Sequence, residues 1–330
     1  AAGVDVVPRA IKLNDTKAEV PKRITDLEKK DIKGCTHVIQ NVLPHHMDYN
    51  GKFEKNIGIY FTETSHFTSS SWPTKLNLMD ELWVCNDQMK DAAANSGIGT
   101  PCHTVHVPSY INKYQRGYNP IDLGSDNFKF YFIGEVIRRK NLVALLKAFH
   151  LEFANYESVD LVIKGNVSGL SSEETRAHIL EMCNQVKVNL KLYSDPTFYK
   201  DETIITDRLE NFDLLRLHAS CDCFVAPSFG EAWCIPAFDA VWMGNTPIVD
   251  DTNGWLVSNQ EEPVFGMTQS FADLYVGNED WWNINIKDLR KCMREAYESD
   301  REDKKKRCQE RRNEFSYEAI GNKMKELLNA

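Results

Sequence analysis

The chain has 330 residues, of which 42% are hydrophobic and 26% are charged, and its formal net charge is −9. This composition is ordinary for a folded protein, and the length exceeds what one hydrophobic core usually supports, so we expect two domains. The acidic balance excludes a nucleic-acid-binding role, no apolar run approaches the ~20 residues of a membrane helix, and the opening AAGVDVVPRA lacks the layout of a signal peptide, which together predict a cytoplasmic protein.

The cysteine and histidine patterns indicate neither disulfides nor a metal site. The nine cysteines are an odd number and include no CxxC pair, so neither a disulfide framework nor a zinc ribbon is expected. The pairs His45/His46 and His103/His106 have no acidic or cysteine partners at ligand spacing. We therefore predict that the chain holds no metal and no resident cofactor.

The first third of the chain alternates between short apolar runs and helical stretches. Such alternation predicts a parallel sheet covered by helices. A polar stretch without periodicity follows at 112–127 and is typical of a linker. The expected strands are 36–44, 55–63, 81–87 and 103–109, with a helix at 86–96.

A second alternating series begins after the linker. Leu142, Leu145, Leu146, Phe149 and Phe153 recur at helical spacing, which predicts an amphipathic helix over 141–154. A second helix is expected to open at Ser172 with acidic residues in its first turn. The expected strands are 128–134, 158–165, 188–193, 221–228 and 246–251, and the tail from about 283 is charged and helical.

The segment 221–249 carries the most chemistry. It reads as a strand, a loop with Gly230 and Glu231, and a helix whose first turn holds Pro236. The amides at the start of such a helix, together with its dipole, form an anion site. Glu231 and Asp239 have seven residues between them and could accept hydrogen bonds from sugar hydroxyls.

This segment resembles the donor-site signature of the retaining GT-B glycosyltransferases called glycosyl transferases group 1. The signature reads roughly Pro-Ser, two or three residues, Glu, seven residues, Glu, then Gly-x-Pro-Val. The resemblance implies that Glu231 lies by the donor sugar, that Asp239 binds the ribose hydroxyls, and that backbone amides face the sugar and phosphates. The second acid is Asp rather than Glu, and a Trp-Cys pair replaces the usual Phe-Gly. The matching residues are Pro227-Ser228, Glu231, Asp239 and Gly244-Asn245-Thr246-Pro247-Ile248-Val249, and the implied donor-binding loop residues are Gly230, Ala232, Trp233, Cys234 and Ile235.

A second match lies upstream at 133–150. It is similar to the family's strand, glycine, basic loop and helix, in which an Arg and a Lys neutralise the diphosphate. The resemblance places Gly134 and Lys140 at the family positions, while Glu135 stands where the family usually has Arg. Arg139 beside Lys140, or Arg138, would then supply the missing charge. Three cations at a helix start oppose its dipole, which favours an anionic ligand there.

The N-terminal half is expected to bind the acceptor. The run NIGIYFTETSHF resembles the loop in which relatives place an acceptor-side His or Glu. This makes Glu63 and His66 the candidate catalytic residues beside Glu231, with Thr64 and Trp72 as candidate sugar contacts. Family sequences usually begin with a strand and a Gly-rich loop, which we do not find before AAGVDVVPR.

The sequence therefore predicts an α/β protein with two Rossmann-like doubly wound domains facing a cleft (GT-B), the first lacking its initial strand and Gly-rich loop. The expected boundaries are 1–125 for the acceptor-side domain, 126–310 for the donor domain and 311–330 for a helix crossing back. The implied reaction moves a sugar from a nucleoside-diphosphate sugar to a glycan, lipid or small-molecule hydroxyl, with retention and without metal. The alternatives are a non-catalytic sugar-nucleotide or glycan-binding protein and a GT-B-fold nucleotide-sugar epimerase, with a nicotinamide dehydrogenase disfavoured because no GxGxxG follows a strand.

Overall fold

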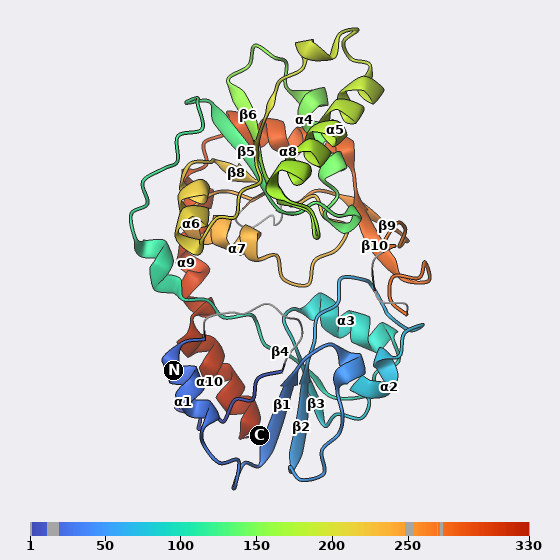
Figure 1. Ribbon diagram of the computed structural model, residues 1–330, viewed down its shortest axis with the longest axis vertical. Helices are drawn as coiled ribbons and strands as arrows, with labels where there is room; N and C mark the ends of the chain where they lie inside the picture. Colours follow the sequence, from blue (N-terminus) through green and yellow to red (C-terminus); the bar gives the residue numbers. More distant parts are fainter. Residues whose placement is uncertain (1, 12–19, 248–253, 269, 271–272, 330) are drawn as a thin grey trace.

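A computed structural model describes residues 2–11, 20–247, 254–268, 270 and 273–329. The chain forms two lobes, each built on a four-stranded parallel sheet (Figure 1). We call them the N lobe, with strands β1 to β4, and the C lobe, with strands β5 to β8. This arrangement confirms the predicted α/β architecture of two Rossmann-like units.

The N-lobe sheet has the strand order β1-β2-β3-β4. Successive side chains of a strand point to opposite faces, so Leu82 and Val84 pack among the residues of α2 and α3, whereas Trp83 packs with Leu327 of the C-terminal helix α10. Helices thus cover both faces of the sheet, as a parallel sheet requires. The elements are α1 (Lys22–Glu28), β1 (His37–Asn41), η1 (Pro44–His46), β2 (Lys55–Ile59), α2 (Trp72–Leu76), β3 (Glu81–Val84), α3 (Asp87–Asn95), β4 (Cys102–Thr104) and the linker turn η2 (Ile111–Gln115).

The C-lobe sheet has the strand order β7-β6-β5-β8. Phe130 and Phe132 of β5 pack against α4, α5 and α8, whereas Tyr131 between them packs against α6 and α7. The elements are β5 (Phe128–Glu135), η3 (Arg138–Lys140), α4 (Leu142–Glu152), β6 (Val159–Asn166), α5 (Ser172–Leu190), η4 (Pro196–Phe198), β7 (Glu202–Ile205), α6 (Asn211–Ala219), β8 (Cys223–Phe224) and α7 (Ile235–Met243).

The last part of the chain adds a hairpin and then runs back to the N lobe. Strands β9 and β10 form an antiparallel pair that the sequence did not predict. The helix α10 lies beside the N-lobe sheet (Figure 1). The elements are β9 (Asn259–Pro263), β10 (Asp280–Ile284), α8 (Ile286–Glu298), α9 (Glu302–Glu310), η5 (Arg311–Phe315) and α10 (Tyr317–Leu328).

One sequence prediction in this lobe is wrong. The expected strand at 188–193 is instead the last turn of α5 and the coil after it. Its apolar alternation does not mark a buried face, because Val188 and Leu192 are exposed, whereas Cys183 and Val186 continue the helical burial period. The helix α5 itself begins at Ser172, as expected, and its N-cap is the residue before it. Ser171, not Ser172, accepts the hydrogen bond from the Glu174 amide. The expected strand at 246–251 lies mostly outside the described residues.

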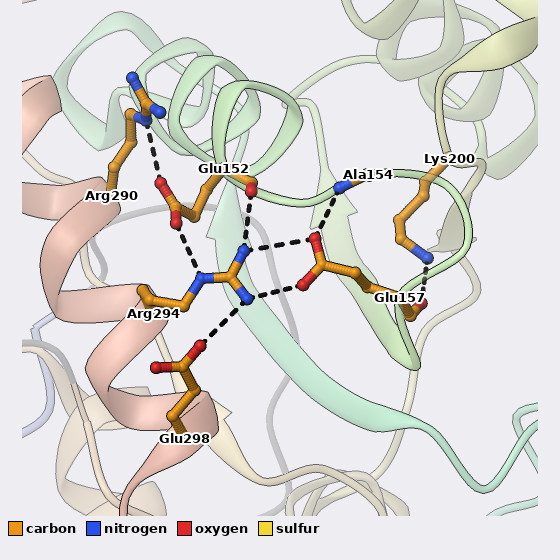
Figure 2. A network of polar contacts seen from close by, with 7 residues as sticks. All are labelled: Glu152, Ala154, Glu157, Lys200, Arg290, Arg294 and Glu298. Carbon is orange, nitrogen blue, oxygen red and sulfur yellow. Dashed lines mark hydrogen bonds and ion pairs between the residues drawn. The ribbon is translucent and has the colours of Figure 1, made fainter.

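A polar network fastens α8 to the connection between α4 and β6 (Figure 2). The Arg294 guanidinium donates from Nε to Glu152 Oε1 at 2.8 Å and from Nη1 to Glu157 Oε2 at 2.6 Å. A third bond runs from Nη2 to the Glu152 carbonyl oxygen at 2.9 Å. All the groups involved belong to the C lobe, so the network ties this lobe together.

Candidate functional site

Two loops meet at the carboxyl edge of the C-lobe sheet. One follows β5 and leads through η3 into α4, and the other follows β8 and leads into α7. These strands are neighbours at the point where the strand order reverses, since β6 and β7 lie on one side of β5 and β8 on the other. Open parallel sheets bind ligands at such a switch point. Both motifs found in the sequence therefore lie at one place.

The second loop presents Glu231 to the cations of the first. Lys140 Nζ lies 2.5 Å from Glu231 Oε1, and Arg139 Nη1 lies 3.3 Å from Glu231 Oε2. The hydroxyl of Ser228 also donates to Glu231 Oε1 at 2.6 Å. The Pro-Ser residues of the signature thus hold the glutamate that follows them.

Arg139 reaches across to the N lobe as well. Its Nη2 lies 3.5 Å from Glu63 Oε1, while the Tyr275 hydroxyl donates to Glu63 Oε2 at 2.5 Å. Burial works to lower the pKa of Arg139, but the Glu63 and Glu231 carboxylates outweigh it and raise that pKa above its ordinary value. Arg139 therefore stays charged between two carboxylates from different lobes. We call Glu63, Arg139, Lys140 and Glu231 the interlobe charge cluster.

Backbone contacts bring the loops and the lobes close together. The Phe229 amide donates to the Arg139 carbonyl at 2.9 Å, and Arg139 Nη1 donates to the Gly230 carbonyl at 2.7 Å. A Cβ at position 230 would lie 2.0 Å from the Glu63 carbonyl oxygen. Only glycine allows this approach, which explains why the donor-loop glycine is required here.

The remainder of the loop after β8, which is predicted to bind the donor, is held by groups of the N lobe. The Ala232 carbonyl accepts from Asn86 Nδ2 at 2.7 Å and from the Cys85 thiol at 3.0 Å. Among the described residues, the amides of 232–235 donate no hydrogen bond. Pro236 lies in the first turn of α7, as predicted. The amides of Cys234 and Ile235 at the start of the helix, with those of Ala232 and Trp233 in the loop before it, are thus candidate donors to an anion.

The side chains of Trp233 and Cys234, two of the predicted donor-binding residues, pack against neighbouring hydrophobic groups. The Trp233 ring stacks on Phe238 with the ring centroids 4.0 Å apart, and it lies 5.6 Å from the His106 ring. Burial raises the pKa of the Cys234 thiol to about 12, so the thiol stays protonated and is a poor nucleophile. Any donor contact from these two residues would come from their backbone.

Asp239 is engaged by the linker. Its Oδ1 accepts a hydrogen bond from the Tyr114 hydroxyl and lies 3.3 Å from Lys113 Nζ. Burial, and after it the charge of Asp239, raises the pKa of Tyr114, which keeps its hydroxyl a donor. The second acid of the signature is therefore bound to the segment that joins the lobes, and its ribose role stays a prediction.

Glu63 and His66 separate in the structure although they are three residues apart in sequence. Glu63 joins the interlobe charge cluster, whereas His66 Nε2 lies 4.0 Å from Asp280 Oδ2 of β10 and its Nδ1 lies 3.2 Å from the Thr68 hydroxyl. Thr64 and Trp72, the candidate sugar contacts, are both buried. The structure thus brings one of the two acceptor-side candidates to the donor residues.

Sequence reasoning missed three groups beside these loops. Tyr275 and Tyr114 lie in stretches without a motif, and only the structure shows that they reach Glu63 and Asp239. Asn141 follows Lys140 in the left-handed conformation, with φ of 51°, and turns the chain from η3 into α4. Its buried Nδ2 has no hydrogen-bond partner among the described residues. Asn is one of the few residue types that adopt this conformation readily, which is the signal that could have identified it.

The described residues form neither a metal-binding cluster nor a membrane-spanning helix. Within the described part of the chain, no three His, Cys, Asp or Glu side chains gather closely enough to hold a metal ion. None of the helices described is long and apolar enough to cross a membrane.

Part of the chain matches a known protein family in sequence, and most of the chain resembles several solved structures in fold. Residues 119–262 match the family described as Glycosyl transferases group 1. No curated protein sequence matches the chain.

Three solved structures illustrate the fold likeness. Sucrose-phosphate synthase from Thermosynechococcus elongatus aligns with a TM-score of 0.59 and 14% identity over 90% of this chain and 73% of that one. A trehalose-phosphate synthase (UDP-forming) from Burkholderia xenovorans gives 0.60 and 10% over 84% and 69%. TarM of S. aureus, solved in complex with UDP, gives 0.56 and 14% over 84% of this chain and 51% of that one. At these identities the likeness establishes the two-lobed GT-B fold.

Proposed function

We propose that the chain, which has the GT-B fold and whose residues 119–262 match the glycosyl transferases group 1 family, is a glycosyltransferase. It would transfer a sugar from a nucleoside-diphosphate sugar to an acceptor hydroxyl with retention and without a metal ion. The observation that carries the proposal is the pairing of Arg139 and Lys140 with Glu231 where the two loops meet. The donor diphosphate would bind to these cations and to the backbone amides of 232–235, which lie before and at the start of α7.

The chemistry follows from where charge develops. Breaking the bond between the anomeric carbon and the diphosphate oxygen leaves a negative charge on the departing diphosphate. Lys140 and Arg139 can stabilise that charge directly, and preorganised donors of this kind supply much of an enzyme's rate enhancement. Glu231, held by Lys140 and Ser228, would lie beside the sugar ring and support the positive charge that forms there.

The two cations would provide the charge that a divalent metal provides in other transferases. UDP is the first donor nucleotide to test, because one similar fold is a UDP-forming synthase and another was solved with UDP. The acceptor hydroxyl, on a glycan, lipid or small molecule, would enter from the N-lobe side, where Glu63 lies. Asp239 would bind the ribose through the carboxylate oxygen that Tyr114 does not occupy.

The test is a turnover assay. Purified chain is incubated with UDP-, GDP- and ADP-sugars, with and without a panel of hydroxyl acceptors, and nucleoside diphosphate release is measured in EDTA and in Mn²⁺. We expect release with one base, undiminished by EDTA, and a product whose anomeric configuration, read from proton NMR couplings, equals that of the donor.

Each part of the proposal has its own contrary result. Inversion at the anomeric carbon would overturn retention, and loss of release in EDTA that Mn²⁺ restores would overturn metal independence. Binding without release would indicate a non-catalytic binding protein. Donor interconversion without an acceptor would indicate an epimerase.

A further inference from the structure

The connection between β9 and β10 crosses from the C lobe to the N lobe. We call the described residues of this connection, 264–268, 270 and 273–279, the strap; the hairpin that carries it lies where the two lobes meet (Figure 1). Asp273 Oδ2 accepts from the Ser71 amide at 3.0 Å and from its hydroxyl at 2.7 Å. Leu274 is buried among the core residues of the N lobe. The strap is therefore anchored in the lobe opposite to the one from which it comes.

Tyr275 follows these anchors in an unfavourable backbone conformation. Its φ is 59°, in the left-handed region that non-glycine residues rarely adopt. The next amide, that of Val276, is held at 2.8 Å by Glu279 Oε2. A strained residue persists only where its surroundings determine it, and such residues concentrate at functional sites. The strain here places the Tyr275 hydroxyl 2.5 Å from Glu63 Oε2.

The charges of the cluster explain why this hydroxyl matters. Arg139 and Lys140 face Glu63 and Glu231, so two positive charges are balanced by two negative ones before any ligand binds. A diphosphate must compete with both carboxylates for Arg139. A hydrogen bond from Tyr275 engages Oε2 of Glu63 and so weakens the attraction of this carboxylate for Arg139. Arg139 Nη2 lies 3.5 Å from the other oxygen, Oε1.

Resting on the proposed function, we propose that Tyr275 is a positioning residue that holds Glu63 back from Arg139 and so keeps that arginine available to the donor diphosphate. Tyr275 acts through Glu63 and touches neither Arg139 nor Lys140 by hydrogen bond. Burial, and after it the charge of Glu63, raises the pKa of Tyr275, so the hydroxyl is a donor throughout the physiological range. The strap thereby sets the affinity of the C-lobe site from the N-lobe side.

The experiment is a double-mutant cycle read by calorimetry. Tyr275→Phe, Glu63→Gln and the double variant are titrated with UDP, GDP and ADP and with the matching nucleosides. We expect Tyr275→Phe to weaken binding of the diphosphate about three- to tenfold, the range of a typical net hydrogen-bond contribution, while nucleoside binding is unchanged. In the Glu63→Gln background the same substitution should change diphosphate affinity by less than about twofold, because coupled residues do not act additively.

Tyr199→Phe is the matched control. It removes one hydrogen bond, from the Leu192 amide, in another part of the C lobe, and it should leave both affinities unchanged. Equal losses for Tyr275→Phe in both backgrounds, or equal losses for diphosphate and nucleoside, would overturn the proposal and leave Tyr275 a structural residue. If Tyr275→Phe does not fold, Glu63→Gln alone decides. Diphosphate affinity that is unchanged or higher supports competition for Arg139, and a tenfold loss overturns it. Failure of every diphosphate to bind the parent chain would instead refute the proposed function.

Discussion

Two arginines of the C lobe lie between carboxylates, and their contacts differ in length and in origin. Arg294 makes three bonds of 2.6 to 2.9 Å and two longer contacts of 3.3 and 3.4 Å, all to groups of its own lobe (Figure 2). Arg139 lies 3.3 Å and 3.5 Å from carboxylates of different lobes, and its shortest bond is to a backbone carbonyl. The first guanidinium is fully engaged within the fold, whereas the second retains capacity for another anion. The pairing of Arg294 within one lobe is that of a structural group, whereas the looser pairing of Arg139 between lobes is what the proposed diphosphate-binding role requires.

The largest effect that would sharpen this comparison is on turnover. Glu231→Gln keeps the shape of the side chain but removes the charge beside the sugar, so we expect turnover to fall about 10²- to 10³-fold, the scale of losing one preorganised electrostatic group. Nucleotide affinity, measured by calorimetry, should change much less. Glu173→Gln, at an exposed position of α5, is the matched control. Normal turnover by Glu231→Gln would make Glu231 a structural loop residue.

The next effect is on folding. Arg294→Ala should lower the free energy of unfolding by about 1.5–3 kcal/mol, because it leaves the partly buried carboxylates of Glu152 and Glu157 without their charged donor. Urea denaturation measures this, and nucleotide affinity should not change. Arg290→Ala, on the same helix, removes a single partly exposed ion pair to Glu152 and should cost at most about 1 kcal/mol. A loss of nucleotide binding in Arg294→Ala would contradict the purely structural role that we assign to this arginine.

Asp239 should show a smaller effect on binding. One of its oxygens is occupied by Tyr114 and Lys113, so Asp239→Ala should weaken nucleotide binding about tenfold, the lower end for a charged hydrogen bond. The readout is discrimination between a normal and a 2′,3′-dideoxy nucleotide, which the variant should lose. Discrimination equal to the parent's, with a lower melting temperature, would show that Asp239 serves only to hold the linker.

The smallest predicted effect is that the difference in unfolding free energy between the parent and Arg294→Ala shrinks at acid pH. The hydrogen bond from Arg294 is the main cause that lowers the pKa of Glu157. A carboxyl whose pKa is lower in the folded state stabilises the fold above its ordinary pKa and loses this contribution as the pH falls through the lowered value. The stability gap between the parent and Arg294→Ala, measured by urea denaturation, should therefore narrow below about pH 4. A gap that widens there would contradict the ion-pair account.

The sequence predicted the local parts of this site. The strand-loop-helix units around Lys140 and Glu231 were predicted because periodicity, Pro236 and Gly230 are local signals. The partnership of Glu63 with Arg139 was not predicted, because it depends on how two separately folded lobes meet. His66, paired with Glu63 by the sequence, lies beside Asp280 instead.

The strap shows what local patterns cannot indicate. Its anchor Leu274 is buried in the other lobe, and nothing near Tyr275 in the sequence distinguishes it from a surface loop residue. The expected strand at 188–193 was wrong for a related reason. Its apolar residues alternate, but Val188 is exposed in the last turn of the long helix α5. That helix begins much earlier in the chain, after its N-cap Ser171. Apolar spacing alone therefore did not distinguish this exposed helix end from a strand.

The central claim, that the interlobe charge cluster binds the donor diphosphate, is tested most directly by calorimetry on Lys140→Ala. The parent and the variant are titrated with UDP, GDP and ADP and with the matching nucleosides, and Lys147→Ala, at an exposed position of α4, is the control. We predict that Lys140→Ala weakens binding of the diphosphate by about 1.5–3 kcal/mol, or roughly ten- to a hundredfold, and leaves nucleoside binding unchanged. Equal losses for diphosphate and nucleoside, or no loss for either, would contradict the claim.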